Sequence, residues 1–267
     1  MIVRNALRRL NRKLRAPKRF IVLCHARSGS NLLTWSLGAQ EAVEEYGEIF
    51  HDSPGQAGLG LPPRIQPYQR GADAARFLDA DIFGPCPEPK TRAHGFKIFY
   101  DHARSTPAVK AAWRYLIEDT DIRVIHLIRR NLLDCLLSLE VAKRTGEWFR
   151  RPGEQPAPPP VAPFSLSPWA CLEHFGETTT SRMWATEAFS RHPVLTLEYE
   201  KDVCGDFSGA MARAFDFIGV PPIPVTAPVV RQRSREPFEQ LLNYDELRRW
   251  FRHTLFEEFF PPAGVSE

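Results

Sequence analysis

The segment 25–31 has the residue types of a phosphate-binding loop. It reads His-Ala-Arg-Ser-Gly-Ser-Asn and stands between a short apolar run and a segment with helical spacing of leucines. Backbone N–H groups at the start of a helix, with the positive end of the helix dipole, bind anions. Arg27 adds a full positive charge, Gly29 allows close approach of the backbone, and Ser28 and Ser30 add hydroxyl groups. An ordinary N-cap turn explains the same segment, so a second feature has to support an anion site.

The loop differs from the nucleoside triphosphate P-loop, GxxxxGK[ST]. The first glycine is missing, and Asn31 follows Ser30 where the P-loop has lysine and a metal-binding hydroxyl. A second apolar run, 122–128, ends in Arg129 and Arg130 and not in the acidic residue that such enzymes place near Mg²⁺. Two guanidinium groups repel a metal ion and attract a phosphate. A P-loop kinase or similar phosphotransferase is therefore the less favoured alternative.

A second anion site is predicted just after this run. Ser138 stands eight residues beyond Arg130, two turns into a predicted helix. An arginine at a strand end and a serine on the adjoining helix can converge on one phosphate. Each residue also has a plain interpretation, Arg130 as a surface charge and Ser138 as a small core residue. The two loops are therefore informative mainly as a pair.

Alternating strands and helices are expected to position these loops. Nearly continuous apolar runs, which are typical of parallel strands buried on both faces, alternate with segments of helical periodicity. The predicted class is α/β: a single three-layer domain with a central parallel sheet and a P-loop-like strand–loop–helix. A basic arm covers 1–19 and the domain covers 20–267. Expected strands are 20–24, 95–99, 122–128 and 194–197; expected helices are 32–37, 109–117, 132–143, 169–190 and 207–218; expected loops are 53–70 and 151–168.

Together the two motifs resemble those of the PAPS-dependent sulfotransferase superfamily (PAPS is 3′-phosphoadenosine 5′-phosphosulfate). The loop RSGSNLL is similar to the family's phosphosulfate loop RSGSTLL, with Asn31 in place of threonine. Arg130 and Ser138 have the spacing of the residues that hold the 3′-phosphate. Segments 95–102, 195–202 and 231–234 look more like the bacterial Stf0/NodH-type branch than the cytosolic small-phenol branch. The resemblance covers roughly 20–260.

The resemblance implies transfer of a sulfuryl group from PAPS to a hydroxyl-bearing acceptor, with a carbohydrate or glycolipid favoured. No metal is expected, because positive side chains can replace one beside a sulfonate. Related enzymes are often dimers, which leaves a homodimer open. The implied cofactor contacts are Arg27, Ser28, Gly29, Ser30, Asn31, Leu32, Arg130, Ser138, Gln232 and Arg233.

Catalysis needs cations at the sulfonate and a base at the acceptor hydroxyl. Arg27 is expected at the sulfonate oxygens, with Lys97 as a second cation. The Stf0-type enzymes carry a glutamate after the first helix, and Glu48 matches it. Burial by its two apolar neighbours is expected to raise the pKa of Glu48 toward the working range. The alternative bases are His51 and His102.

Three further interpretations concern residues near these. The nearby acids Glu41, Glu44 and Glu45 are expected to form an exposed acidic face. Trp169 and Trp184 of the helix 169–190 are expected in the core, and His25 is expected to be structural or ligand-orienting.

Charge and composition limit the other functions. Residues 1–19 carry eight basic and no acidic side chains, whereas the remaining chain carries 27 basic and 32 acidic ones, a net charge of −5. An acidic body argues against nucleic-acid binding, and the basic arm is either a solvated terminus or a peripheral contact with an anionic membrane. No apolar stretch reaches the roughly 18 residues of a membrane span, and a cytoplasmic location is expected. The five cysteines lack zinc spacing. A non-catalytic nucleotide-binding protein remains the alternative from another class.

Overall fold

The computed structural model describes most of the chain. Most of the predicted basic arm, together with Gln232 and Arg233, lies outside the described residues. The described residues are 16–51, 60–69, 71–85, 88–154, 160–229 and 236–262.

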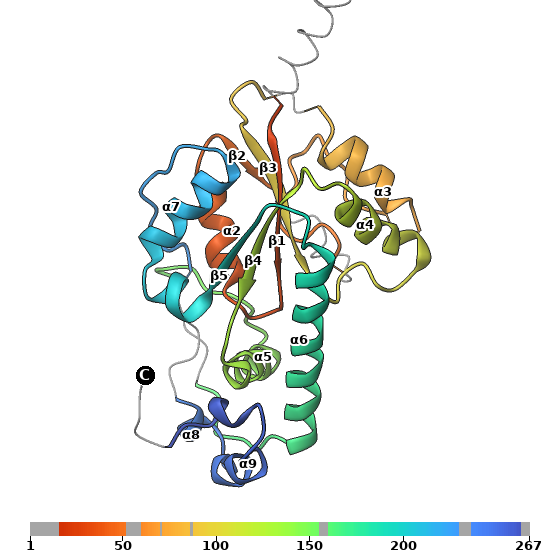
Figure 1. The fold of residues 1–267 in the computed structure, drawn as a ribbon. Helices are drawn as coiled ribbons and strands as arrows, with labels where there is room; N and C mark the ends of the chain where they lie inside the picture. The colour runs from red at the N-terminus through yellow and green to blue at the C-terminus, as the bar shows by residue number, and fades with distance from the viewer. Residues whose placement is uncertain are drawn as a thin grey trace, which may run out of the picture.

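The centre of the molecule is a five-stranded parallel sheet in the order β2-β3-β1-β4-β5 (Figure 1). The central strand β1 pairs with β3 on one side and β4 on the other, so Cys24 lies between Phe99 and Leu127. All five strands run in one direction, and their carboxyl ends therefore meet at one edge of the sheet. The strands are β1 (Lys18–Cys24), β2 (Val43–Glu45), β3 (Ala93–Phe99), β4 (Arg123–Ile128) and β5 (Val194–Glu198).

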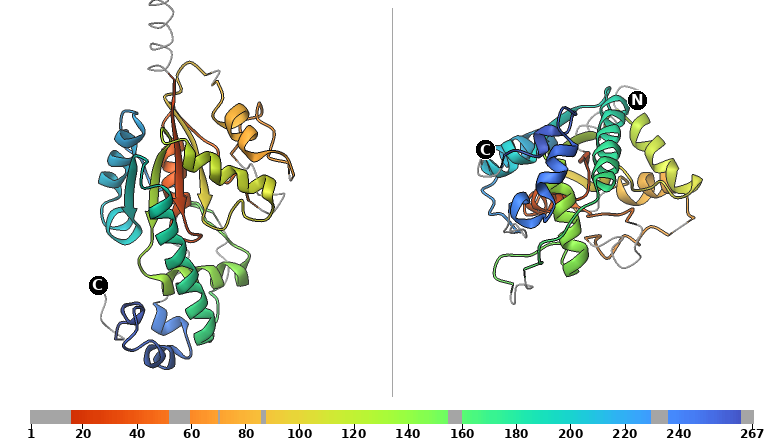
Figure 2. Two further views of the ribbon diagram at one scale, coloured as in Figure 1. Left: turned by 45° about the vertical axis from the view of Figure 1, so that its right-hand side comes forward. Right: turned by 90° about the horizontal axis from the view of Figure 1, so that it is seen from below.

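Helices cover both faces of the sheet, as Figures 1 and 2 show. On one face lie α2 (Ser30–Gly38) and α7 (Phe207–Ile218). On the other lie α3 (Ala74–Phe77), α4 (Pro107–Glu118) and the C-terminal half of α6 (Pro168–Ala188). Successive residues of β1 point to opposite faces, so Phe20 and Val22 join one core while Ile21 and Leu23 join the other. The predicted three-layer α/β architecture is confirmed.

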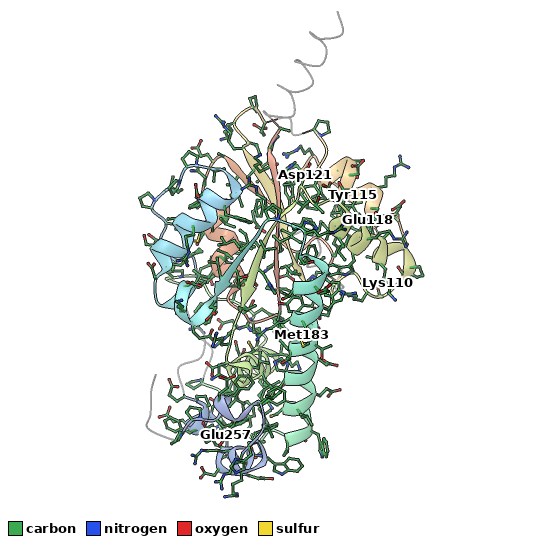
Figure 3. All side chains as sticks on the ribbon, viewed as in Figure 1. Lys110, Tyr115, Glu118, Asp121, Met183 and Glu257 are labelled. Atoms are coloured by element: carbon green, nitrogen blue, oxygen red, sulfur yellow. The ribbon has the colours of Figure 1, made fainter. Side chains whose placement is uncertain are left out.

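A third core lies beyond the carboxyl edge of the sheet. It joins α5 (Leu132–Thr145), the N-terminal half of α6, α8 (Pro237–Gln240), α9 (Tyr244–Trp250) and η3 (Glu257–Phe259). Figure 3, in which Met183 and Glu257 are labelled, shows this lobe below the sheet. Phe175 at its centre packs against the rings of Phe251, Phe256, Phe259 and Phe260.

Helix boundaries follow local signals in the sequence. The side chain of Asn131 accepts from the Asp134 N–H at the start of α5, which ends at the left-handed Gly146. Asp206 caps α7 through the Gly209 N–H, and the predicted end of this helix at 218 is confirmed, because Gly219 follows it in the left-handed conformation with φ of 79°. No helix among the described residues is long and apolar enough to cross a membrane.

Several expectations about individual segments were wrong. The strand β2 was not predicted, because three residues are too few for a readable pattern. The acids there are not an exposed face: the Glu44 side chain is only 16% exposed, whereas Glu41 is 82% exposed. Trp169 is 67% exposed, because it stands in the first turn of α6 beyond the packed stretch, while Trp184 packs on Trp113 in the core. The described residues 160–167 before α6 form no helix or extended strand, as predicted, and the Phe164 N–H donates to the Gln240 carbonyl at the end of α8.

Two buried histidines should make the fold sensitive to acid. Burial lowers the pKa of His94 in β3 and of His126 in β4 to about 4. A histidine with a lowered folded-state pKa contributes its full stability above about pH 6.5 and loses it as the pH falls toward about 4. At pH 5 we expect each of the two histidines to lower the free energy of unfolding by on the order of 2 kcal/mol. Urea unfolding at pH 7.5 and pH 5 measures this loss.

The variant His94→Leu separates this cause from general acid effects. The Nδ1 atom of His94 is buried with no hydrogen-bond partner among the described residues. Replacing the imidazole by leucine should therefore leave the protein folded at pH 7.5. The variant should lose roughly 2 kcal/mol less than the wild type between the two pH values. An equal loss in both proteins would show that His94 is not buried in its neutral form.

Candidate active site

The side chains singled out from the sequence come together at the carboxyl edge of the sheet, the lower edge in Figure 1. The loop 25–29 follows β1, Glu48 follows β2, and Arg130 follows β4. Lys97 lies near the end of β3, and His102 comes just after it. Ligands of parallel α/β sheets bind at this edge, because the loops that leave neighbouring strands meet there.

The loop 25–29 leads into α2 without an ordinary cap. Gly29 is the N-cap residue, with φ of 84°, and within the described part of the chain no side chain caps this helix. The Ser28 hydroxyl donates to the His25 carbonyl at 2.7 Å. Arg27 also has positive φ, 65°. The first-turn N–H groups of α2 are therefore not used by a side-chain cap, which favours an anion site over the plain N-cap interpretation.

Gly29 is packed under the ring of Tyr199. A Cβ atom at this position would lie 2.4 Å from Tyr199 Cδ2, in a backbone conformation that favours glycine. We expect Gly29→Ala to weaken nucleotide binding by roughly tenfold or more and to cost about 1–3 kcal/mol of stability. Calorimetry and thermal unfolding measure the two effects. Gly176→Ala in α6 is the matched control, because its Cβ meets nothing within 4 Å. Equal behaviour of the two variants would contradict a tight loop.

Arg27 contacts the helix that carries the second predicted motif. Its Nε donates to Ser138 Oγ at 3.0 Å, and Nη1 donates to the Trp148 carbonyl. Burial lowers the pKa of Arg27, and the neighbouring Arg129 charge lowers it further. Two guanidinium groups therefore lie close together at the loop, one of them paired with Asp134.

Arg129 contacts the backbone of the loop 25–29. It was not among the predicted site residues. It is 7% exposed and its Nη1 donates to the Arg27 carbonyl at 3.1 Å. Its guanidinium lies 4.6 Å from the centre of the Tyr199 ring and 3.0 Å from Asp134. The sequence signal was its position directly after a buried strand, where alternation turns it inward and turns Arg130 outward.

Arg130 and Ser138 make different contacts in the structure. The Arg130 side chain is 69% exposed and pairs with Glu198 at 2.8 Å, while its backbone N–H donates to Glu200. No hydrogen bond joins Arg130 to Ser138 among the described residues, and Ser138 accepts from Arg27. Their convergence on one phosphate therefore stays a prediction. An exposed ion pair such as Arg130–Glu198 is weak and can exchange for a phosphate.

A chain of contacts joins the loop to the predicted base. Lys97 Nζ lies 2.7 Å from Glu48 Oε1 and also donates to the side-chain oxygen of Asn31. The Lys97 side chain is only 3% exposed. Asn31, which stands where the family usually has threonine, thus holds the lysine between the first turn of α2 and the carboxylate.

Two histidines lie on the other oxygen of Glu48. The Nε2 atoms of His51 and His102 are 3.8 and 3.9 Å from Glu48 Oε2. His102 Nδ1 accepts the Phe99 N–H at 3.4 Å, which favours the neutral tautomer that carries its proton on Nε2, toward Glu48. Burial lowers the pKa of His102.

The pKa expected for Glu48 was wrong in direction. Burial alone would raise it, but the charge and hydrogen bond of Lys97, with the two histidines, hold the pKa of Glu48 below its ordinary value. The apolar neighbours Ile49 and Phe50 are buried as predicted. The carboxyl is therefore ionised at neutral pH in this state of the protein.

Among the described residues, Glu48, His51 and His102 form the group whose ligand atoms lie close enough together to bind a cation. One atom each from Glu48, His51 and His102 lies within 4.8 Å of the others. A metal ion would have to compete with the Lys97 ammonium for the same carboxylate. A reaction without a metal stays a prediction.

Two further predicted residues, His25 and Leu32, pack against neighbouring side chains. His25 packs edge to face on His174 at 5.0 Å, and burial lowers the pKa of His25 to about 3, so it is neutral and suited to a structural role. Leu32 packs against the core under α7.

The chain is similar to known proteins over most of its length. No family model matches the chain. Nodulation protein H of Rhizobium meliloti (strain 1021) is 29% identical over 257 residues, which cover 93% of this chain and 97% of that protein. A crystal structure of a sulfotransferase from Alicyclobacillus acidocaldarius aligns over 88% of this chain and 91% of its own, with 15% identity and a TM-score of 0.46. Nodulation protein H of Rhizobium tropici is 32% identical over 259 residues, 95% of this chain and 97% of that protein. The chain thus belongs to the nodulation protein H family of sulfotransferases.

Proposed function

We propose that the protein transfers the sulfuryl group of PAPS to a hydroxyl of a carbohydrate or glycolipid, without a metal ion. The observation that carries the proposal is the contact chain from Asn31 through Lys97 to Glu48. In this chain a cation and a carboxylate lie side by side next to the first turn of α2. Transfer to a hydroxyl needs this pair, one group for the sulfonate and one for the proton.

The proposed reaction is a single displacement. The acceptor oxygen attacks sulfur and forms the new S–O bond, while the bond between sulfur and the 5′-phosphate oxygen breaks. The hydroxyl proton passes to Glu48, and 3′-phosphoadenosine 5′-phosphate (PAP) leaves with the bridging oxygen. Arg27, Lys97 and the N–H groups of α2 balance the charge on the sulfonate and bridging oxygens.

Lys97 links cofactor binding to the strength of the base. In the structure its ammonium lowers the pKa of Glu48, which makes the carboxylate a weak base. A sulfonate beside Asn31 would attract the same ammonium away from the carboxylate. The pKa of Glu48 then rises, because burial remains and the compensating charge is weakened. The base is strengthened only when the donor is bound.

The finer assignments rest on the sequence. Arg130 and Ser138 are proposed for the 3′-phosphate, and Ser28, Ser30 and the loop N–H groups for the 5′-phosphosulfate. A cytoplasmic location and a homodimer are proposed with them.

Calorimetric titration with PAP in EDTA tests the nucleotide half of the proposal. We expect the affinity for PAP to exceed that for AMP by roughly tenfold or more, because the 3′-phosphate adds charge-assisted hydrogen bonds. The affinity for PAP should not change when Mg²⁺ is added. ATP in the presence of Mg²⁺ is the comparator. Binding of ATP in preference to PAP, or only with Mg²⁺, would overturn the proposal and favour a phosphotransferase.

A further inference from the structure

The peptide group between Arg129 and Arg130 is held at both of its polar atoms. Its carbonyl oxygen accepts a hydrogen bond from Arg182 Nη2 on α6. Its N–H donates to Glu200 Oε2 at 2.9 Å, and the other oxygen of Glu200 accepts the N–H of Asn131 at 3.1 Å. The turn from β4 into α5 is therefore fixed by two side chains, one from α6 and one from the segment that follows β5.

This peptide group sets the directions of both arginines. Arg129 turns inward, where its Nη1 donates to the Arg27 carbonyl at 3.1 Å. Its guanidinium also lies 4.6 Å from the centre of the Tyr199 ring, under which Gly29 is packed. Arg130 turns outward and is 69% exposed. Because binding groups must be held to within about 0.5 Å, a rotation of this one peptide would disturb both proposed anion sites.

The surroundings of Arg182 give its charge no counter-charge. None of the ion pairs among the described residues includes this side chain, and its Nε is buried without a hydrogen-bond partner. Burial, together with the nearby positive charge, lowers the pKa of His25 to about 3 and the pKa values of His126 and His174 to about 4. Burial raises the pKa of Tyr100, which also lies beside Arg182. A half-buried cation among neutral groups costs stability, so its contact with the end of β4 calls for a functional reason.

We propose that Arg182 and Glu200 are positioning residues for the sulfuryl donor. They hold the 129–130 peptide so that Arg129 supports the phosphosulfate loop while Arg130 faces the 3′-phosphate. Both residues act through these two arginines and not by contact with the nucleotide. The inference rests on the proposed function, because it assigns the two anion sites to one nucleotide.

Calorimetric titration of Arg182→Met with PAP and AMP tests the first of the two residues. Methionine fills much of the same space but cannot donate to the carbonyl. The affinity for PAP should fall roughly tenfold or more, as expected for the loss of a charged donor. The affinity for AMP should fall less, because AMP lacks the phosphate that Arg130 is proposed to hold. The Tm of the nucleotide-free variant should stay within about 4 °C of the wild type, because an uncompensated charge is removed together with the hydrogen bond.

Arg123→Met is the matched control. Arg123 is also half-buried, donates to a backbone carbonyl, that of Phe217, and makes no ion pair among the described residues. It lies at the opposite end of β4, so its replacement should leave both affinities within about twofold of the wild type. Arg182→Lys keeps the charge and a donor, and it should bind PAP about threefold or more tightly than Arg182→Met.

Glu200→Asp separates the contacts from the charge. Aspartate keeps the negative charge but is one methylene shorter, so it cannot accept both N–H groups in the same geometry. The Glu200 side chain is 38% exposed, and the variant should therefore fold. The affinity for PAP should fall roughly threefold or more although the net charge is unchanged. This variant and Arg182→Lys carry the test if Arg182→Met unfolds.

The same titrations give the results that would overturn the inference. It fails if PAP affinity stays within about twofold of the wild type in Arg182→Met or in Glu200→Asp. Equal losses of PAP and AMP affinity in Arg182→Met, or equal losses in Arg182→Met and Arg123→Met, also overturn it. A lower Tm in Arg182→Met without recovery of PAP binding in Arg182→Lys would assign the arginine a structural role alone. Wild-type protein that does not bind PAP would instead defeat the proposed function.

Discussion

Glu48→Gln should lower kcat by about 10²–10⁴-fold while the affinity for PAP stays within about twofold. The amide keeps the shape of the carboxylate and an oxygen for Lys97, but it cannot take the acceptor proton. Rapid-mix measurement of sulfuryl transfer from labelled PAPS, with PAP calorimetry, separates the chemical step from binding. A variant that keeps more than about a tenth of wild-type kcat would exclude Glu48 as the base.

The histidine variants decide between Glu48 and its neighbours. His51→Gln and His102→Gln should each lower kcat far less than Glu48→Gln. The nearest nitrogens of both rings lie 3.8 and 3.9 Å from Glu48 Oε2, beyond hydrogen-bond distance. In Glu48→Gln the Lys97 ammonium, 3% exposed, loses its ion-pair partner, so thermal unfolding must accompany the kinetics. A loss of activity in His102→Gln equal to that in Glu48→Gln would move the role of base to the histidine.

The pH dependence of kcat/KM tests the role of Glu48 independently. Because the pKa of Glu48 lies below its ordinary value in the free enzyme, kcat/KM for PAPS should stay level from pH 8 down to about 6. Glu48 loses its charge only as the pH falls through its lowered pKa. An acid limb within this pH range would contradict Glu48, ionised in the free enzyme, as the base.

Arg130→Ala should weaken PAP binding by roughly ten- to a hundredfold and leave AMP binding unchanged. The guanidinium is exposed and pairs with Glu198, so its removal should not affect folding. The selectivity follows because AMP lacks the 3′-phosphate that the arginine is proposed to hold. Calorimetry with both nucleotides measures it, and Arg27→Ala should weaken binding of both, since Arg27 is proposed to contact the 5′ end.

Arg213→Ala is the matched control for Arg130→Ala. Arg213 is also an exposed arginine in an ion pair, with Asp202, but it lies on α7. Its removal should leave PAP affinity unchanged. Equal losses of PAP and AMP affinity in Arg130→Ala, or equal losses of PAP affinity in both arginine variants, would contradict a specific 3′-phosphate contact.

Much of the architecture could be predicted because its signals are local. The strands β1, β3 and β4 are largely buried on both faces and therefore read as apolar runs, whereas the edge strand β5 buries Leu197 and exposes Val194. The short β2 and the helices α8 and α9 depend on packing against distant segments and carried no such signal. The residue types of the anion loop were readable for the same reason, since a strand, a glycine turn and a helix start are contiguous.

The electrostatics of the site were decided by tertiary structure. The pKa of Glu48 depends on Lys97, which the pairing of β3 with β2 brings beside it, and the sequence interpretation considered only adjacent residues. The contact between Arg27 and Ser138 joins positions 111 residues apart. Glu45 read as a surface acid, and the β2 edge placed it in a cavity wall.

The sequence by itself thus determined the strand–loop–helix, the layer order and the family, because these follow from patterns within single segments or over the whole chain. Only the tertiary structure decided which charges meet, since an ion pair or a cavity is formed by side chains that the fold brings together from different strands. For this protein that difference is largest at Glu48 and Glu45, two acids three residues apart. Lys97 lowers the pKa of the first, and burial raises that of the second to about 7.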